Sequence, residues 1–303
     1  MRKVLFFIIA GIAIAQIAYM VLEQGLRKFN RYYFERRTEL FENNREFDVI
    51  FLGSSRTQVQ INPCIFDSIT GFTSYNFGMK GCNSFEALII LRGYLENHPA
   101  PNYLIYNIDH PSVREQHTIP NSEMYLFFAH NNAVYQGLNK MGYPGFWIRY
   151  IPFTRLFYFD DYLRNIAIQG WLGKSQIKSG SNYCRGHESE LNDRVDPSTL
   201  DTITDIPFQG HFQYVDEMLR VCNENKIQLV FHQTPIIYRG DKPTSGQSIS
   251  GLESYCEDRG ILLWRFDTVK TYGPDLFYDE VHLNKTGSEK YSAEIARKFL
   301  EHL

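Results

Sequence analysis

Residues 48–57 read DVIFLGSSRT, and this stretch decides the fold. Its apolar run is rich in β-branched and aromatic types and passes directly into a glycine and two serines. Such a run is typical of a buried strand that ends in a tight turn. Open α/β sheets carry their chemistry at the carboxyl ends of parallel strands. The second serine of the turn, Ser55, is therefore predicted to lie at the active edge of a sheet.

A second polar stretch, DEVHLN at residues 279–284, lies near the other end of the chain. One loop can present both Asp279 and His282, which are three positions apart. A serine hydroxyl becomes a nucleophile at neutral pH when a base lies beside it, and a histidine oriented by a carboxylate is such a base. The residues predict Ser55 as nucleophile, His282 as base and Asp279 as the group that orients the base. His232, at the end of another predicted strand, is a rival base.

Apolar runs of strand length alternate with amphipathic helical patterns on both sides of residues 112–207. Strands that alternate with helices pair in parallel, and the helices cover both faces of the sheet. The predicted fold class is therefore α/β, a three-layer α/β/α parallel sheet. Strands are expected at residues 48–52, 75–77, 103–108, 227–232 and 261–266. Helices are expected from Ser84 to about residue 95, over residues 212–222, from about 246 to 259, and from 285 to 300.

Residues 112–207 break this alternation, because the sequence there is irregular and rich in aromatic residues. We expect a helical insertion that caps the active edge of the sheet, with one helix that ends at Trp171. Aromatic side chains dominate the walls of many ligand pockets. They also form the cores of helical domains, so two interpretations remain open: a substrate groove, or the core of the insertion itself.

The chain begins with MRK and continues with 19 residues, 4–22, that carry no charge. About 20 apolar residues are needed to cross the hydrocarbon core of a membrane as a helix. We favour an uncleaved, single-pass signal anchor over residues 1–25, with the rest of the chain outside the cytoplasm; a cleaved signal peptide and a buried helix are the alternatives. Residues 26–47 are charge-rich with helical spacing, which predicts a solvated stalk. The α/β domain then spans residues 48–303.

Charge and cysteine content argue against several classes of protein. The net charge of −3 leaves no basic excess to neutralise phosphates, so we expect no nucleic-acid partner. The five cysteines form no CxxC pair, which argues against a zinc site and a dense disulfide framework, although one disulfide remains possible outside the cytosol. The turn after the first strand lacks a phosphate-binding glycine run such as GxGxxG, which argues against a flavodoxin-like nucleotide-binding protein. No cofactor or metal is therefore expected.

With these stretches in place, the chain resembles the SGNH/GDSL hydrolase superfamily over residues 48–109 and 208–303. More narrowly, it is similar to a membrane-anchored branch in which Gly-Ser-Ser replaces Gly-Asp-Ser. That branch includes proteins of alginate O-acetylation and teichoic-acid D-alanylation. The resemblance implies a flavodoxin-like fold. The family's first block falls on Gly53-Ser54-Ser55, with Ser55 as nucleophile; its second block falls on NFGMKG at residues 76–81, and its last on DEVH at residues 279–282.

The resemblance also implies an oxyanion hole. Its donors are the backbone N–H groups of Ser55 and Gly81, with Asn107 as the counterpart of the asparagine in the family's third block. The family has Gly-x-Asn-Asp in that block, whereas this sequence has NIDH at residues 107–110. Asn107 falls within the predicted strand, and strand alternation can direct its side chain elsewhere. The hole is then completed by another group or is poorer than usual.

The favoured hypothesis is a membrane-anchored, extracytoplasmic serine esterase or O-acyltransferase. Its substrate would be an acyl ester of a cell-envelope or exported polysaccharide, and a membrane-bound O-acyltransferase is a candidate partner. The alternative is a non-catalytic accessory of the same fold, which binds glycan or docks with such an acyltransferase. Arg56 has two interpretations, a contact to an anionic substrate or an exposed residue that opens a helix. His110 and His211 are weaker candidates for the base.

Overall fold

The computed structural model describes residues 1–29, 31–109, 117–120, 122–175, 183–189, 206–207, 212–239, 242–243 and 249–303. The chain divides into two compact units. Unit 1 comprises Met1–Asn43 and Asn121–Ser179, and unit 2 comprises Asn44–Pro120 and Gly180–Leu303. Each unit is described by itself below.

Unit 2 is built on a parallel five-stranded sheet in the order β11-β7-β3-β1-β2. The strands are β1 (Val49–Leu52), β2 (Ser74–Asn76), β3 (Tyr103–Asn107), β7 (Gln228–Gln233) and β11 (Leu262–Arg265). The order reverses between β1 and β3, which is the topological switch point of a flavodoxin-like sheet. All five predicted strands are present, and the predicted parallel α/β fold is confirmed.

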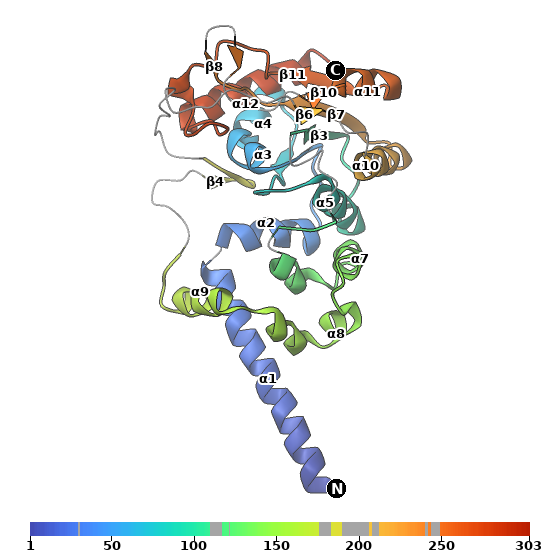
Figure 1. Cartoon of the computed structure of the whole chain (residues 1–303), viewed down its shortest axis with the longest axis vertical. Coiled ribbons are helices and arrows are strands. Elements are labelled where there is room, and N and C mark those ends of the chain that lie inside the picture. Colours follow the sequence, from blue (N-terminus) through green and yellow to red (C-terminus); the bar gives the residue numbers. More distant parts are fainter. Residues whose placement is uncertain are drawn as a thin grey trace. The chain divides into compact units, whose positions relative to one another are not determined.

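Helices cover both faces of this sheet (Figure 1). On one side α12 packs against α3 and α4, and on the other α5 packs against α10. The helices of unit 2 are α3 (Ser55–Gln60), α4 (Pro63–Thr70), α5 (Ser84–Asn97), α10 (Gln213–Glu224), α11 (Leu252–Arg259) and α12 (Lys285–Leu300). Short two-stranded pairs are β4 (Tyr183–Cys184) with β5 (His187–Glu188), β8 (Tyr238–Arg239) with β9 (Lys242–Pro243), and β6 (Ile206–Pro207) with β10 (Ile249–Ser250).

The core under α4 and α12 is aromatic. The ring of Phe51 from β1 lies 5.1 Å from that of Phe66 in α4, which lies 5.2 Å from that of Phe299 in α12. Ile105 and Val230 of the neighbouring strands complete this buried cluster. Burying a side chain of this size stabilises the fold by roughly 1.5–3 kcal/mol. The cluster therefore fixes α12, and the loop that precedes it, on the sheet.

One predicted boundary is wrong. The sequence predicts a helix from about residue 246, but Ile249 and Ser250 form β10 and α11 begins only at Leu252. Gly251 separates the two elements with φ +82°. This left-handed conformation, which glycine adopts without strain, turns the chain from the strand into the helix.

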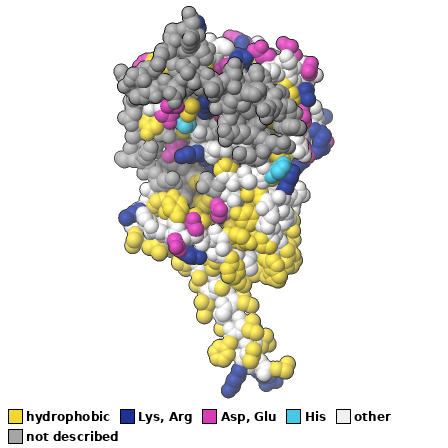
Figure 2. Space-filling view, viewed as in Figure 1, with side chains coloured by type: hydrophobic (Ala, Val, Ile, Leu, Met, Phe, Trp, Pro, Cys, Tyr) yellow, Lys and Arg dark blue, Asp and Glu magenta, His cyan; other side chains and the backbone are white. Residues whose placement is uncertain are grey.

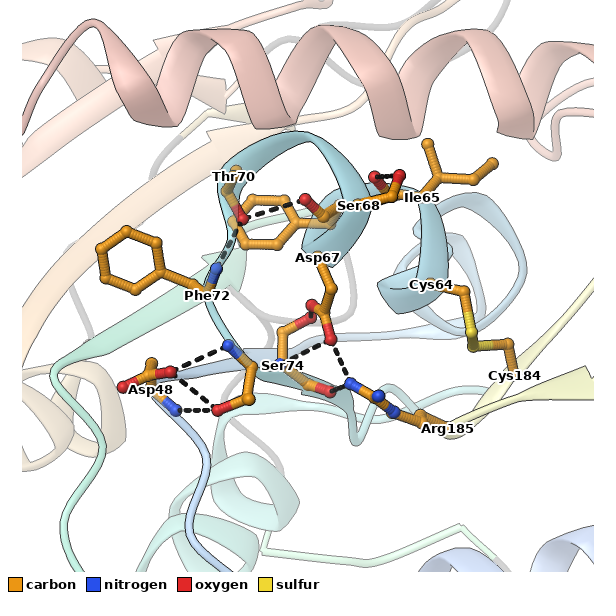
Figure 3. Close-up of polar contacts among 12 residues, drawn as sticks. Asp48, Cys64, Ile65, Asp67, Ser68, Thr70, Phe72, Ser74, Cys184 and Arg185 are labelled. Atoms are coloured by element: carbon orange, nitrogen blue, oxygen red, sulfur yellow. Dashed lines mark hydrogen bonds and ion pairs between the residues drawn. A yellow bond between two sulfur atoms is a disulfide. The ribbon is translucent and has the colours of Figure 1, made fainter.

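The β4–β5 hairpin is fastened to α4 by a disulfide between Cys64 and Cys184, whose Cα atoms are 6.2 Å apart (Figure 3). Arg185 in the turn of the hairpin also forms an ion pair with Asp67 of α4. On the other side, His187 Nε2 lies 3.0 Å from the carbonyl oxygen of Val59 in α3. The β4–β5 hairpin is therefore bound covalently to α4 and through a hydrogen bond to α3, the helix that follows the end of β1.

Unit 1 is helical. Its elements are α1 (Arg2–Phe29), α2 (Arg31–Phe41), η1 (Ser122–Phe128), α7 (Asn132–Lys140), α8 (Gly145–Tyr150), η2 (Pro152–Tyr158) and α9 (Asp161–Trp171). The part of the predicted insertion from Ser122 to Trp171 is thus helical and rich in aromatic residues, and its last helix ends at Trp171 as predicted. The described residues of its later part, at 183–189 and 206–207, belong to unit 2 and include the short strands β4, β5 and β6. Its expected place over the edge of the sheet stays a prediction.

α2 is a packed helix and not the solvated stalk that its charge-rich sequence predicts. The ring of Phe34 lies 5.4 Å from that of Phe127, and the ring of Phe41 lies 6.1 Å from that of Tyr125. The Arg37 guanidinium lies over the Tyr125 ring, 4.6 Å from its centroid. Cation–π contact lets an arginine enter an aromatic cluster, which is why the polar composition is misleading here.

α1 contains 28 residues, or about 42 Å of helix. Among the described residues it is the one helix with the length and apolar composition to cross a membrane. Its amino-terminal side chains, such as Phe6 and Ile14, are exposed. The expected apolar helix is therefore present, while its placement in a membrane stays a prediction.

Breaking the disulfide is expected to destabilise unit 2. A bond that closes a loop of 120 residues restricts the unfolded chain, which typically contributes about 2–5 kcal/mol. Cys64→Ser, Cys184→Ser and the double variant should therefore show one common decrease in melting temperature. Dithiothreitol should lower the melting temperature of the parent chain and leave that of the double variant unchanged. An equal response of both chains to dithiothreitol would show that the bond does not form.

Candidate active site

The turn after β1 requires glycine at its first position. Gly53 has φ +144°, and a Cβ atom there would lie 2.3 Å from Thr57 Oγ1 and 2.7 Å from Asn107 Cβ. Ser54 is the N-cap of α3, and Ser55 is its first helical residue. Because β1 borders the switch point of the sheet, the turn presents a half-buried Ser55 at the edge where α/β proteins carry their chemistry.

Ser55, His282 and Asp279 lie in series. His282 Nε2 is 2.8 Å from Ser55 Oγ, and His282 Nδ1 is 2.8 Å from Asp279 Oδ2. With the proton on Nδ1 donated to Asp279, Nε2 accepts the hydrogen bond of the Ser55 hydroxyl. The structure therefore brings together the three side chains that the sequence predicts as nucleophile, base and orienting group, in the geometry that such a relay requires.

The carboxylate of Asp279 also organises its own loop. Asp279 Oδ1 accepts hydrogen bonds from the backbone N–H groups of Val281 at 2.9 Å and His282 at 2.8 Å. An isolated β-bridge between Phe277 and Leu283 closes the loop. These bonds explain the Asp-x-x-His spacing, because one carboxylate fixes both the backbone and the ring of the histidine.

Electrostatics keep Asp279 ionised. Burial by itself raises the pKa of its carboxyl, but the hydrogen bonds from His282 and from the Val281 N–H lower it by more, so that the pKa lies below its ordinary value. The group is therefore a carboxylate at neutral pH. It can accept the Nδ1 proton of His282 and stabilise the positive ring that forms when His282 takes a second proton.

A set of hydrogen bonds outside the triad joins α3 to α12 and the loop before it. Gln60 Nε2 at the end of α3 donates to the carbonyl oxygen of Val281 at 2.8 Å. The N–H of Asn62 donates to Ser292 Oγ of α12 at 2.8 Å. Asn284 caps α12 by accepting from the N–H of Gly287. The helix that begins with Ser55 and the loop that carries His282 are thereby held together independently of the Ser55–His282 hydrogen bond.

The structure also shows a contact that sequence analysis missed. The buried hydroxyl of Ser54 donates to the buried carboxylate of Asp109, two residues beyond the end of β3. In the SGNH/GDSL superfamily, which the sequence resembles, an aspartate takes the position of Ser54. Asp109 lies in the stretch NIDH, residues 107–110, which matches the third block of that superfamily only weakly. A signal was present in the sequence, since both residues follow neighbouring strands and meet at one sheet edge, but their pairing depends on side-chain direction.

Gly81 lies in the turn that follows β2. Its φ is +74°, and its chain segment is anchored to the nucleophile turn because the N–H of Met79 donates to the carbonyl oxygen of Gly53 at 3.0 Å. Within the described ranges, the N–H groups of Ser55 and Gly81 form no hydrogen bond with the protein. Both can therefore donate a hydrogen bond to a negatively charged oxygen.

Asn107 is the last residue of β3 and is fully buried. Its side chain packs beside Gly53, and its amide Nδ2 lies 3.4 Å from the carbonyl oxygen of His232. An N–H of Asn107 thus points at β7. Its role as a third oxyanion donor remains a prediction.

His232, the rival candidate for the base, and Arg56, the candidate contact to an anionic substrate, are not members of the Ser55–His282–Asp279 series. His232 is completely buried, and its Nδ1 lies 2.8 Å from the Tyr291 hydroxyl. Burial lowers the pKa of His232 to about 3, so the ring is neutral. Arg56 is half-buried at the start of α3; burial lowers its pKa, while the charges of Asp109 and Asp279 act in the opposite direction.

His110 and His211 lie outside the described residues. Over the part of the chain that the structure covers, no three His, Cys, Asp or Glu side chains are grouped to hold a metal ion.

No protein-family model and no curated protein matches the chain. Among solved structures it is similar to a protein from Desulfitobacterium hafniense described as lipolytic and of the G-D-S-L family, with 13% identity, TM-score 0.42, and coverage of 83% of this chain and 99% of the other. A protein from Bacteroides fragilis described as an acylhydrolase has 15% identity, TM-score 0.38, and coverage of 88% and 95%. A GDSL-like lipase from Bacteroides thetaiotaomicron has 12% identity, TM-score 0.39, and coverage of 90% and 97%. All three TM-scores are below 0.5, so the function proposed below rests on the geometry of the site.

Gly53→Ala is expected to destabilise unit 2 by more than about 3 kcal/mol, because a methyl group would be forced into Thr57 and Asn107. Gly71→Ala is the matched control. Gly71 also has a positive φ, +77°, but a Cβ atom there meets nothing within 4 Å, so that only the backbone cost of about 1 kcal/mol applies. Urea denaturation measures both. Equal losses would show that the turn after β1 is not as closely packed as described.

Proposed function

We propose that this protein is a serine ester hydrolase or O-acyltransferase of the SGNH/GDSL type, with Ser55 as nucleophile, His282 as base and Asp279 as the residue that orients the base. The observation that carries the proposal is the continuous series of hydrogen bonds from Ser55 Oγ through the His282 ring to the Asp279 carboxylate. Its position at the switch point of a flavodoxin-like sheet supports the same conclusion.

In the first half of the reaction, Ser55 Oγ attacks the acyl carbon of an ester and its proton passes to His282 Nε2. The tetrahedral oxyanion accepts hydrogen bonds from the N–H groups of Ser55 and Gly81. Each such donor typically contributes about 3 kcal/mol of transition-state stabilisation. The carbon–oxygen bond to the leaving group then breaks, and His282 returns its proton to the alcohol that departs. The product of this half is an acyl-Ser55.

In the second half, an acceptor hydroxyl attacks the acyl-Ser55 while His282 removes its proton. Ser55 then leaves and regains that proton from His282. If the acceptor is water, the enzyme is an esterase; if it is a sugar hydroxyl, the enzyme is an O-acyltransferase. The chemistry of the protein side chains is the same in both cases.

The proposed substrate is an acyl ester of a cell-envelope or exported polysaccharide, and the proposed location is the outer side of a membrane that α1 crosses. Two observations support this location. α1 has the length and composition of a membrane span, and the Cys64–Cys184 disulfide is of a kind that forms in oxidising compartments. At the membrane, the proposed partner is a membrane-bound O-acyltransferase.

Ser55→Ala is expected to reduce kcat/KM for p-nitrophenyl acetate by at least about 10³-fold, because the acyl-enzyme can no longer form. The melting temperature should stay within about 1–2 °C of that of the parent chain, since the change removes one half-buried hydroxyl. Ser68→Ala, at an exposed serine of α4, is the control and should keep full activity. Full activity of Ser55→Ala would move the nucleophile elsewhere, whereas a folded parent chain without any activity would favour the non-catalytic accessory.

Asp279→Asn is expected to lower kcat on the order of 10⁴-fold, because an amide carries no charge to stabilise the protonated His282 and can hold the ring in the wrong tautomer. Since the pKa of Asp279 lies below its ordinary value, the parent chain should lose no activity through this group until the pH falls below about 4. Asp275→Asn, at an exposed position of the preceding turn, is the control. Unchanged kcat in Asp279→Asn would remove this residue from the mechanism.

A further inference from the structure

Unit 1 exposes a group of large apolar side chains on three consecutive short helices. Six of them are between 53% and 81% exposed. They are Phe146, Trp147 and Tyr150 of α8, Phe157 of η2, and Tyr162 and Ile168 of α9. We call these six residues the aromatic collar. Figure 2 shows hydrophobic side chains gathered, among polar ones, on the part of the surface nearest to α1, and further hydrophobic side chains along α1 itself.

α9 is fastened to α1 through backbone contact. A Cβ atom on Gly25 would lie 2.2 Å from the carbonyl oxygen of Ala167, and one on Gly170 would lie 2.0 Å from that of Gly25. The indole N–H of Trp171 donates to the carbonyl oxygen of Val21 at 2.9 Å. The close approach of two glycines leaves no room for adjustment, so α9 has one fixed position beside residues 21–25 of α1.

The other two helices are fixed at the same level of α1. Arg155 of η2 donates from Nη1 to the hydroxyl of Tyr19 at 2.7 Å and from Nε to the carbonyl oxygen of Ile148 at 3.0 Å. Tyr19 is buried, and its ring stacks on Phe127 at 6.1 Å. One arginine therefore connects α1, η2 and α8, and it holds the helices of the collar near residue 19.

The length of α1 before Tyr19 matches the thickness of the hydrocarbon core of a membrane. From Arg2 to Tyr19 the helix rises by about 26 Å, and the hydrocarbon core of a bilayer is about 27–30 Å thick. The side chains before Tyr19, such as Phe7 and Ile17, are exposed. If Arg2 and Lys3 mark one face of the bilayer, Tyr19 and the helices around it lie at the other face.

We propose that the aromatic collar inserts into the lipid–water interface around the emerging α1, so that unit 1 sits on the bilayer instead of being held away from it. The inference rests on the proposal that α1 crosses a membrane and goes beyond the proposed enzymatic function. Tryptophan and tyrosine favour this interface because each joins an apolar ring to a polar group. Exposed Lys28 is nine residues beyond Tyr19, or about 14 Å further along α1. Its ammonium lies 3.5 Å from the Trp171 ring centroid and places a positive charge on the headgroup side of the collar, where it meets lipid phosphates.

Tryptophan fluorescence tests the proposal in the full-length chain, which contains Trp147, Trp171 and Trp264. The chain is reconstituted into vesicles of phosphatidylcholine and phosphatidylglycerol that carry bromine atoms on the acyl chains, either near the headgroups or near the bilayer centre. A chain with Trp147 alone (Trp171→Phe, Trp264→Phe) should lose most of its fluorescence with shallow bromines and less with deep ones. A chain with Trp264 alone, which is buried in β11, is the control and should lose none.

A second comparison avoids the loss of the Trp171–Val21 hydrogen bond. Trp147→Phe alters only an exposed side chain. Because the variant lacks the fluorescence of Trp147, the parent chain should lose a larger share of its fluorescence to shallow bromines than the variant does. Vesicle flotation is measured in parallel. A chain that floats with the vesicles while Trp147 stays unquenched overturns the collar and leaves α1 as a simple anchor, which is the result expected if the surface binds a protein partner. A chain that does not float with the vesicles overturns both the aromatic collar and the proposal that α1 crosses a membrane. Neither the quenching nor the flotation depends on Ser55, so a failure of the collar can be told apart from a failure of the proposed enzymatic function.

Discussion

The hydrogen bond between Ser55 and His282 joins two residues 227 positions apart, and the rest of unit 2 is arranged so that it can form. The sheet holds β1, whose end delivers Ser55, and the aromatic cluster of Phe51, Phe66 and Phe299 holds α12 on that sheet. The bond from Gln60 to Val281 then sets the loop of His282 against the helix of Ser55. A relay that tolerates errors of about 0.5 Å needs this kind of support from its surroundings.

The polar groups around Ser55 and His282 are held by hydrogen bonds within the protein. Asp279 accepts two backbone N–H groups and one ring N–H, which together outweigh the cost of its partial burial. Ser54 and Asp109 tie the turn of the nucleophile to the end of β3. The N–H groups of Ser55 and Gly81 have no hydrogen-bond partner among the described residues, and we propose that they are the donors of the oxyanion hole. Donors that are already in place when negative charge develops would stabilise it without rearrangement of the protein.

Much of this could be predicted from the sequence, because strand periodicity and glycine turns are local signals. The stretch from Val49 to Ser55 predicted both the strand and its turn, and the spacing of Asp279 and His282 predicted a single loop. The Ser54–Asp109 pair was not predictable, since it depends on which way two side chains point after their strands end. α2 was misread because Arg37 lies on the Tyr125 ring, so that a charged residue belongs to a core. The start of α11 was misplaced because Gly251 separates a short strand from it.

The central claim is that Ser55 is the activated nucleophile, and labelling with a fluorophosphonate followed by peptide mass spectrometry tests it most directly. Attack by Ser55 Oγ on phosphorus would expel fluoride and leave a stable phosphonyl ester. We predict one adduct, on the peptide that contains Ser55, and its loss in His282→Ala. An adduct on another serine, or a folded chain that forms no adduct, would contradict the account.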